Sequence, residues 1–232
     1  MLLITLFSVF NIFFNRNCVS DNVIDKLISN KHAIQAHIKP QQWVLDYIWI
    51  HYDNAGNQYL LSFSITPAYK YSYIMDFYRK ITHKSEKFMN YICKDPFKKN
   101  LSVVANCLEN VADQNGLRKS DVALSFVQSL QYQSIPYYQK YAMQTIYDNC
   151  GDCSDKSILL AGIFSQWNYD CIFLDFEDHL AVGIYSEDRT GTYYEHRGRK
   201  FFYCETTTPG FKIGNAGDKT GYDAYIHEVY CQ

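Results

Sequence analysis

The spacing of apolar and polar residues predicts helices in the middle of this chain and strands after them. Apolar residues recur at three- and four-residue intervals from Leu101 to Ala112 and from Val122 to Leu130, which predicts two amphipathic helices. A third predicted helix is apolar on nearly all sides from Ile158 to Trp167, so we expect it to be central and buried. Three strand-like runs follow: Cys171 to Phe176, Leu180 to Tyr185 and Tyr193 to Thr207. Helices followed by strands predict an α+β fold with an antiparallel sheet.

The N-terminal half carries a second pattern, that of a β-hairpin. Val44 to Tyr52 and Gln58 to Ile65 are rich in β-branched and aromatic residues, and Asp53 to Gly56 between them has turn residues. Aromatic residues at helical offsets predict a helix from Ala68 to about Met89. We therefore expect an N-terminal part of hairpin and helices over residues 21–100 and a core over residues 101–232.

Two further stretches show no regular pattern. A Tyr- and Gln-rich segment from Tyr137 to Asp148 is interpreted as a connection. From Gly210 onward the chain is glycine-rich and is expected to be irregular, closing with a short tail at Tyr225 to Tyr230.

The first residues suggest export. Met1 to Phe14 carries no charge and is almost wholly apolar, which suits the core of a signal peptide and is short for a membrane span of about 20 residues. The small residues around Cys18 to Ser20 offer a cleavage site, although the positively charged start of a signal peptide is absent. Residues 1–20 are therefore interpreted as a signal peptide or an N-terminal anchor, the protein as extracytoplasmic, and residues 1–14 as the means of any membrane association. The alternative is an ordinary buried segment.

Charge and cysteine content narrow the classes of function. The 232 residues include 22 basic and 24 acidic ones, giving a net charge of −2, so a basic surface for nucleic acid is not expected. The 8 cysteines lack the spacing of a disulfide framework, which leaves the redox compartment open.

The segment from Gly151 to Ser157 places Cys153 where a turn ends and the apolar helix begins. Unpaired backbone N–H groups and the helix dipole favour a thiolate at such a position, and the thiolate is the nucleophile. Asp152 and Asp155 have the spacing of a capping box, which would fix the start of the helix.

Two later residues complete a catalytic set. His179 stands at the start of a predicted core strand, and Glu205 ends an aromatic strand. A thiol, an imidazole that takes its proton and a carboxylate that orients the imidazole form a cysteine triad. His196 is the competing histidine, but its polar surroundings predict the tip of a hairpin in solvent.

These residues also carry a family resemblance. The segments Gly151–Leu160, His179–Gly183 and Tyr203–Thr207, with Gly210 and Gly214, resemble the transglutaminase-like superfamily and most of all its prokaryotic cysteine-peptidase-like branch. The segment Ser125–Tyr132 is similar to the helix that precedes the nucleophile in that branch.

The resemblance implies a papain-like core, with Cys153 on the central helix, His179 and Glu205 on adjacent strands and Gln128 as an oxyanion donor. It implies a cysteine peptidase or amidase acting on a peptide, protein or cell-wall amide, and we expect no cofactor. Many members of the superfamily carry aspartate where this chain has Glu205, so the third role is the least defined.

Three alternatives remain open. Cys150 and Cys153 form a Cys-x-x-Cys pair that a dithiol redox module would use. A zinc site would need two further ligands, and the sequence offers no second Cys-x-x-Cys and no matching histidine pair. The domain could also be a catalytically idle binding or scaffold module, because function does not follow from fold.

Overall fold

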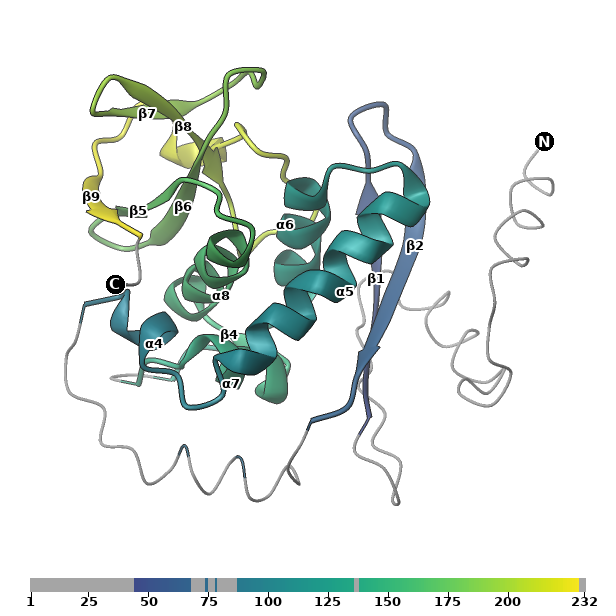
Figure 1. The fold of residues 1–232 in the computed structure, drawn as a ribbon. Helices are drawn as coiled ribbons and strands as arrows, with labels where there is room; N and C mark the ends of the chain where they lie inside the picture. Colours follow the sequence, from purple (N-terminus) through teal and green to yellow (C-terminus); the bar gives the residue numbers. More distant parts are fainter. Residues whose placement is uncertain (1–43, 68–73, 75–77, 79–86, 136–137, 230–232) are drawn as a thin grey trace. The chain divides into compact units, whose positions relative to one another are not determined.

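After an N-terminal β-hairpin, helices precede the strands of the main sheet, as predicted, in a computed structural model that describes residues 44–67, 74, 78, 87–135 and 138–229 (Figure 1). The predicted α+β class is confirmed, with the helices packed against an antiparallel sheet. The described helices are α4 (Asn90–Cys93), α5 (Lys99–Asn115), α6 (Lys119–Ser129), α7 (Ala142–Asp148) and α8 (Cys153–Gln166).

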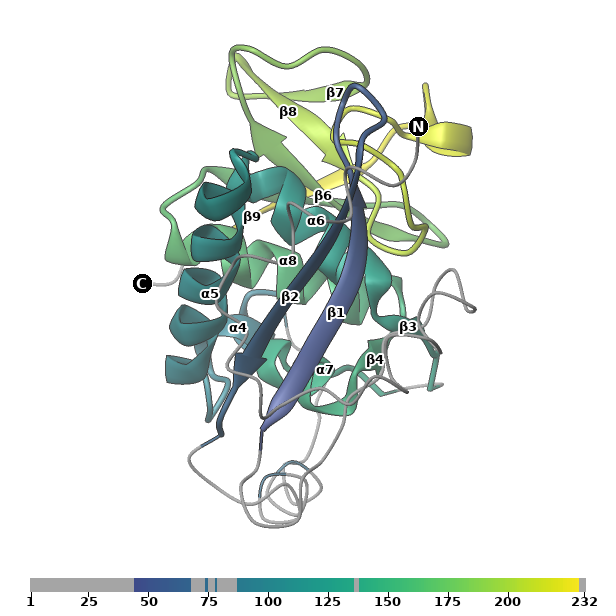
Figure 2. The ribbon, with the colours of Figure 1, turned by 90° about the vertical axis from the view of Figure 1, so that its right-hand side faces the viewer.

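The predicted hairpin is present. Strand β1 (Leu45–Tyr52) pairs antiparallel with β2 (Gln58–Ile65). Alternate residues of both strands are buried, as expected for a two-stranded sheet with one face on the core. That face packs on α6, where the Phe126 ring lies 5.1–5.4 Å from the rings of Tyr47, Trp49 and Phe63. Figure 2 shows the hairpin running along α6.

Helix α8 is the central element. Its residues from Ile158 to Phe164 are buried, as the apolar pattern predicted. It contacts α5, α6 and α7 and also the sheet strands β5 (Cys171–Asp175) and β6 (Leu180–Tyr185). The N-terminal end of α8 is thereby held in a fixed relation to the ends of the strands.

Five strands form the main sheet in the order β7-β8-β6-β5-β9, every neighbouring pair being antiparallel. The predicted run from Tyr193 to Thr207 consists of two strands joined by a tight turn at Arg197 and Gly198, both of which have positive φ. The remaining strands are β7 (Tyr193–His196), β8 (Arg199–Cys204) and β9 (Tyr225–Glu228).

Two predictions of irregular structure are wrong. Much of the expected connection from Tyr137 to Asp148 forms α7, and the tail forms β9 against β5. Helix α7 packs on α8, and an edge strand needs a partner, so both elements depend on tertiary contacts that local patterns do not show.

Several predictions fall outside the described residues. They are the apolar segment of residues 1–14, the cleavage site around Cys18 to Ser20 and most of the helix predicted from Ala68. Every described residue belongs to one compact unit that extends from Ile34 to Gln232. The division at residues 20 and 100 stays a prediction. Within the described part of the chain, no helix has the length and apolar character needed to cross a membrane.

Candidate active site

Cys153 is the first residue of α8, as predicted. The backbone that leads into Cys153 is fixed by a short parallel pair between β3 (Gln131–Tyr132) and β4 (Cys150–Gly151). The Asp152 carboxylate accepts hydrogen bonds of 3.0 Å from the backbone N–H groups of Ser154 and Asp155, and Asp155 accepts one from the Asp152 N–H. The predicted capping box is therefore confirmed, and it leaves the half-buried Cys153 thiol free at the positive end of the helix.

Glycine is required at position 151 because a side chain has no room there. A Cβ atom at this position would lie 2.7 Å from the Asp155 Cβ and 3.1 Å from a Thr145 methyl group. Any larger residue would push apart the capping box and the β3–β4 pair. The turn therefore sets the position of Cys153 by close packing.

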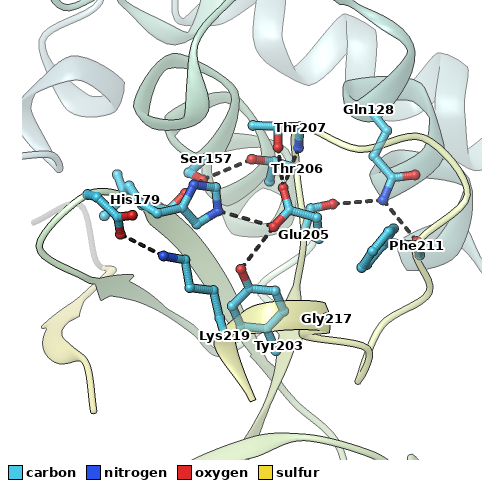
Figure 3. Close-up of polar contacts among 12 residues, drawn as sticks. Gln128, Ser157, His179, Tyr203, Glu205, Thr206, Thr207, Phe211, Gly217 and Lys219 are labelled. Carbon is cyan, nitrogen blue, oxygen red and sulfur yellow. Dashed lines mark hydrogen bonds and ion pairs between the residues drawn. The ribbon is translucent and has the colours of Figure 1, made fainter. Parts of the chain in front are cut away.

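His179 and Glu205 lie at the same edge of the sheet. His179 directly precedes β6 and Glu205 directly follows β8, and these strands are antiparallel neighbours. The His179 Nε2 atom lies 3.1 Å from Glu205 Oε2, as Figure 3 shows. The Cys153 side chain also acts on His179, because it is among the causes that raise the pKa of the imidazole, and since Nε2 faces Glu205, Nδ1 is the nitrogen left for the thiol.

The charges of this set support one another. Burial lowers the pKa of His179, but hydrogen bonds to Cys153 and Glu205 and the negative charges of both outweigh it and raise that pKa to about 9. Burial raises the pKa of Glu205, but hydrogen bonds from His179 and Thr207 and the imidazolium charge outweigh this effect and lower it to about 2. At neutral pH the imidazole is therefore protonated and the carboxylate charged.

The Glu205 carboxylate is held by more than the histidine. Oε2 also accepts a hydrogen bond of 2.9 Å from the hydroxyl of the fully buried Tyr203, and Oε1 accepts from the backbone N–H and the hydroxyl of Thr207 (Figure 3). Sequence reasoning assigned no role to Tyr203 or Thr207. The only signal for them was their place on either side of Glu205.

Ser157 joins the helix that begins at Cys153 to the segments that carry His179 and Glu205. It lies one helical turn after Cys153, and its hydroxyl donates a hydrogen bond of 2.8 Å to the backbone oxygen of Leu180, next to His179. The hydroxyl of Thr206, next to Glu205, lies 3.2 Å from Ser157 Oγ. Since the Ser157 hydrogen goes to Leu180, Thr206 is the donor in this second contact.

The hydrogen bonds of Gln128 differ from those expected of an oxyanion donor. Its Nε2 donates to the backbone oxygens of Glu205, at 2.7 Å, and Phe211, at 2.9 Å (Figure 3). Its Oε1 accepts a hydrogen bond from the Gly210 N–H. A primary amide has two hydrogens, and both are used here. No hydrogen remains for an oxyanion, which contradicts the predicted role. Gln128 instead anchors the backbone of Glu205.

A buried lysine fixes Gln128 in turn. The Lys156 ammonium lies beneath the end of α6 and donates a hydrogen bond of 2.6 Å to the backbone oxygen of Leu130. The backbone oxygen of Gln128 lies 3.4 Å from the same ammonium. Burial lowers the pKa of Lys156 to about 8 against the opposing charges of Glu205 and Cys150. Lys156 thus satisfies carbonyl groups at the C-terminal end of α6.

Cys150 lies in a different environment from Cys153. Its buried thiol donates a hydrogen bond of 2.8 Å to Gln133 Oε1, and the Lys140 ammonium lies 3.3 Å from its sulfur. Both cysteines of the Cys-x-x-Cys pair are free thiols. Their surroundings differ, because the Cys153 side chain raises the pKa of His179, whereas Cys150 contacts Gln133 and Lys140.

The competing histidine is elsewhere. His196 is the last residue of the edge strand β7, two strands from β6, and its Nε2 lies 2.8 Å from Glu228 Oε1. Among the residues that the structure describes, no three potential metal ligands of the His, Cys, Asp and Glu type gather at one place.

Comparison of the chain with family models, with curated proteins and with solved structures found no match. The interpretation of the site therefore depends on its own geometry.

Proposed function

We propose that this protein is a thiol acyltransferase, a cysteine peptidase or amidase with Cys153, His179 and Glu205 as its triad. The observation that carries the proposal is the imidazole of His179, whose Nε2 lies 3.1 Å from the Glu205 carboxylate and whose pKa is raised by Glu205 and by the Cys153 side chain. This arrangement stabilises a thiolate and imidazolium pair, the reactive form of a catalytic cysteine.

The first half of the reaction would form a thioester. The Cys153 sulfur attacks the carbonyl carbon of an amide, and the π electrons move to the oxygen. The His179 imidazolium then gives its proton to the amide nitrogen, the C–N bond breaks and the amine leaves. Glu205 keeps its charge throughout and stabilises the imidazolium.

The second half would restore the thiol. Water, or an amine, attacks the thioester carbon while neutral His179 takes the proton of the attacking group. The C–S bond breaks, the sulfur leaves as thiolate, and the acid or the new amide is released. The imidazolium is regenerated for the next cycle.

The oxyanion would be stabilised at the start of α8. Asp152 takes the N–H groups of Ser154 and Asp155 but not that of Cys153 itself. As the first residue of a helix, Cys153 has no partner within the helix for its backbone N–H. A backbone N–H on the nucleophile is a common oxyanion donor.

The proposed family is the transglutaminase-like superfamily, with a papain-like core. Support comes from a cysteine at the start of a central helix, with the histidine and the carboxylate at the ends of two antiparallel neighbours. The predicted signal peptide or anchor in residues 1–20 would place the substrate, a peptide, protein or cell-wall amide, outside the cytoplasm.

The test is turnover of a library of peptides and cell-wall fragments, with hydrolysis and transfer to an added amine scored separately. Cys153→Ala serves as the blank. We expect products that require Cys153, and a thioester on Cys153 detectable by mass spectrometry of acid-quenched protein. Rapid alkylation of Cys153 without turnover of any library member would indicate an idle domain instead. Dithiol oxidation that requires both Cys150 and Cys153 would indicate a redox module.

A further inference from the structure

Lys140 and Cys150 form a buried contact that the proposed reaction does not use. The Lys140 nitrogen lies 3.3 Å from the Cys150 sulfur, and the two residues are 1% and 7% exposed. At this distance no other atom fits between the nitrogen and the sulfur. The Cys150 thiol also donates a hydrogen bond to the exposed residue Gln133, so the pair lies one side chain below the surface.

Three acceptors fix the position of the Lys140 ammonium. It forms an ion pair of 2.9 Å with Asp148 Oδ2, and it donates hydrogen bonds to the backbone oxygen of Cys150, at 3.0 Å, and to the Cys150 sulfur. An ammonium has three hydrogens, so each acceptor takes one. Burial lowers the pKa of Lys140, but Asp148 and Cys150 outweigh this effect and raise that pKa. The nitrogen is therefore held against the sulfur beside a carboxylate that can take a proton.

Oxidation of a thiol has a specific outcome when a nitrogen lies beside the sulfur. A peroxide converts a thiol first into a sulfenic acid, which condenses with a second thiol to a disulfide or with a nitrogen to a sulfenamide. A sulfenic acid that meets neither partner is oxidised further to a sulfinic acid, which thiols do not reduce. At Cys150 the group in contact with the sulfur is the amine of Lys140.

We propose that hydrogen peroxide joins Cys150 and Lys140 by a sulfenamide cross-link, a direct bond between the sulfur and the lysine nitrogen that thiols reverse. The proposal stands whether or not Cys153 is catalytic.

Two steps form the cross-link. In the first, the Cys150 sulfur attacks one oxygen of hydrogen peroxide, the O–O bond breaks, and the thiol proton leaves with the other oxygen as water. In the second, the Lys140 nitrogen attacks the sulfur of the sulfenic acid and the S–O bond breaks. The departing hydroxyl takes one ammonium proton and leaves as water, and Asp148 takes a second. The sulfur loses two electrons overall, and the peroxide gains them.

The cross-link would preserve the backbone around Cys153. Lys140 and Cys150 lie on either side of α7, and the Lys140 backbone N–H donates a hydrogen bond of 2.8 Å to Asp155 of the capping box. A bond between side chains that already touch leaves both segments in place. Its role would be to protect Cys150 from irreversible oxidation.

The test uses the full chain, treated with hydrogen peroxide, denatured, alkylated without reduction and digested with trypsin. Lys140 is the only basic residue between positions 120 and 155, so a modified Lys140 leaves the peptide of residues 120–156 uncleaved. We expect this peptide at a mass about 2 Da below that of the same peptide with Cys150 as a thiol, for the two hydrogens lost. Dithiothreitol added before digestion should restore cleavage after Lys140.

Two controls accompany this measurement. Lys140→Met keeps the approximate length of the side chain but removes the nitrogen, so peroxide should carry Cys150 on to the sulfinic acid. Cys107, a half-buried free thiol on α5, reports within the same sample whether the peroxide dose oxidises thiols. The wild-type digest decides the proposal even if Lys140→Met does not fold.

Other products would overturn the proposal. A disulfide between Cys150 and Cys153 also removes two hydrogens, but trypsin would still cleave after Lys140. Sulfinic acid on Cys150 of the wild type, or an unmodified Cys150 in a sample with oxidised Cys107, would contradict the proposal as well. So would a cross-linked peptide that has gained an oxygen atom, because its link would be S–O–N.

Discussion

His179 Nε2 and Glu205 Oε2 are 3.1 Å apart, and their contact shifts the two pKa values in opposite directions. The histidine gains affinity for its proton and the glutamate loses affinity for its own, so the charged pair persists over a wide pH range. Both side chains are largely buried, with exposed fractions of 13% and 10%. Screening by water is therefore weak at this contact.

The pair predicts a specific dependence of stability on pH. The pKa of His179 rises from 6.5 to about 9 on folding, so its contribution is complete below pH 6.5 and is lost as the pH rises through about 9. The pKa of Glu205 falls from 4.5 to about 2, so its contribution is present above pH 4.5 and is lost as the pH falls through about 2. Urea unfolding of the wild type should show a decline in stability between pH 6.5 and 9.

Glu205→Gln removes the anion that sustains the imidazolium. The pKa of His179, measured by NMR titration, should fall, and the decline in stability should move to lower pH. Glu195→Gln, on the exposed strand β7, is the control and should leave both unchanged. An unaltered His179 titration in Glu205→Gln would show that the carboxylate does not act on the ring.

Cys153 and Cys150 are predicted to have opposite importance. Cys153→Ser should reduce amide cleavage at least about a thousandfold. A serine hydroxyl keeps its proton and so does not replace the thiolate of the thiolate–imidazolium pair with His179. Cys150→Ser should keep most of the activity. Because the Cys150 thiol donates a hydrogen bond to Gln133, the melting temperature should be measured alongside. Iodoacetamide should label Cys153 faster than Cys150 across pH. Faster labelling of Cys150, or cleavage that survives loss of Cys153, would refute the triad.

Tyr203→Phe tests the support of the carboxylate. Loss of the hydroxyl removes one donor to Glu205 Oε2, so the Glu205 pKa should rise and the acid limb of the activity profile should move to higher pH. We expect a loss of about 1 kcal/mol in the free energy of unfolding. Tyr185→Phe, whose hydroxyl contacts Glu187 at the surface, is the matched control. A changed stability with an unchanged pH profile would leave Tyr203 a purely structural residue.

Gln128→Met distinguishes an anchor from an oxyanion donor. The substitution keeps the approximate volume but leaves the backbone oxygens of Glu205 and Phe211 without their donor, which should cost about 2–4 kcal/mol in the free energy of unfolding. Gln58→Met on the exposed end of β2 is the control. A stable Gln128→Met protein with a large loss of kcat would restore the oxyanion role.

The sequence was most informative where the signals are local. The capping residues Asp152 and Asp155 and the apolar helix after them are short-range patterns, and they identified the start of α8 and Cys153 correctly. The positions of His179 and Glu205 followed from the strand pattern, since each lies where a strand meets a loop. The contact between them required the pairing of β6 with β8, which the order of the strands alone does not determine.

The role of Gln128 was beyond local patterns. Its partners Glu205 and Phe211 are 77 and 83 residues away along the chain. A buried glutamine near a nucleophile is equally consistent with donating to an oxyanion and to a backbone oxygen. Only the packing of α6 against the residues after β8 decides between the two.

The bonds of Ser157 to Leu180 and Thr206 have a consequence for the order of folding. Cys153, the proposed nucleophile, belongs to a helix, whereas His179 and Glu205 belong to strand ends that come later in the sequence. A helical intermediate on which the sheet has not yet docked would hold Cys153 as an ordinary thiol, with no imidazolium beside it. The reactivity proposed for Cys153 would then arise only after the sheet has docked on α8.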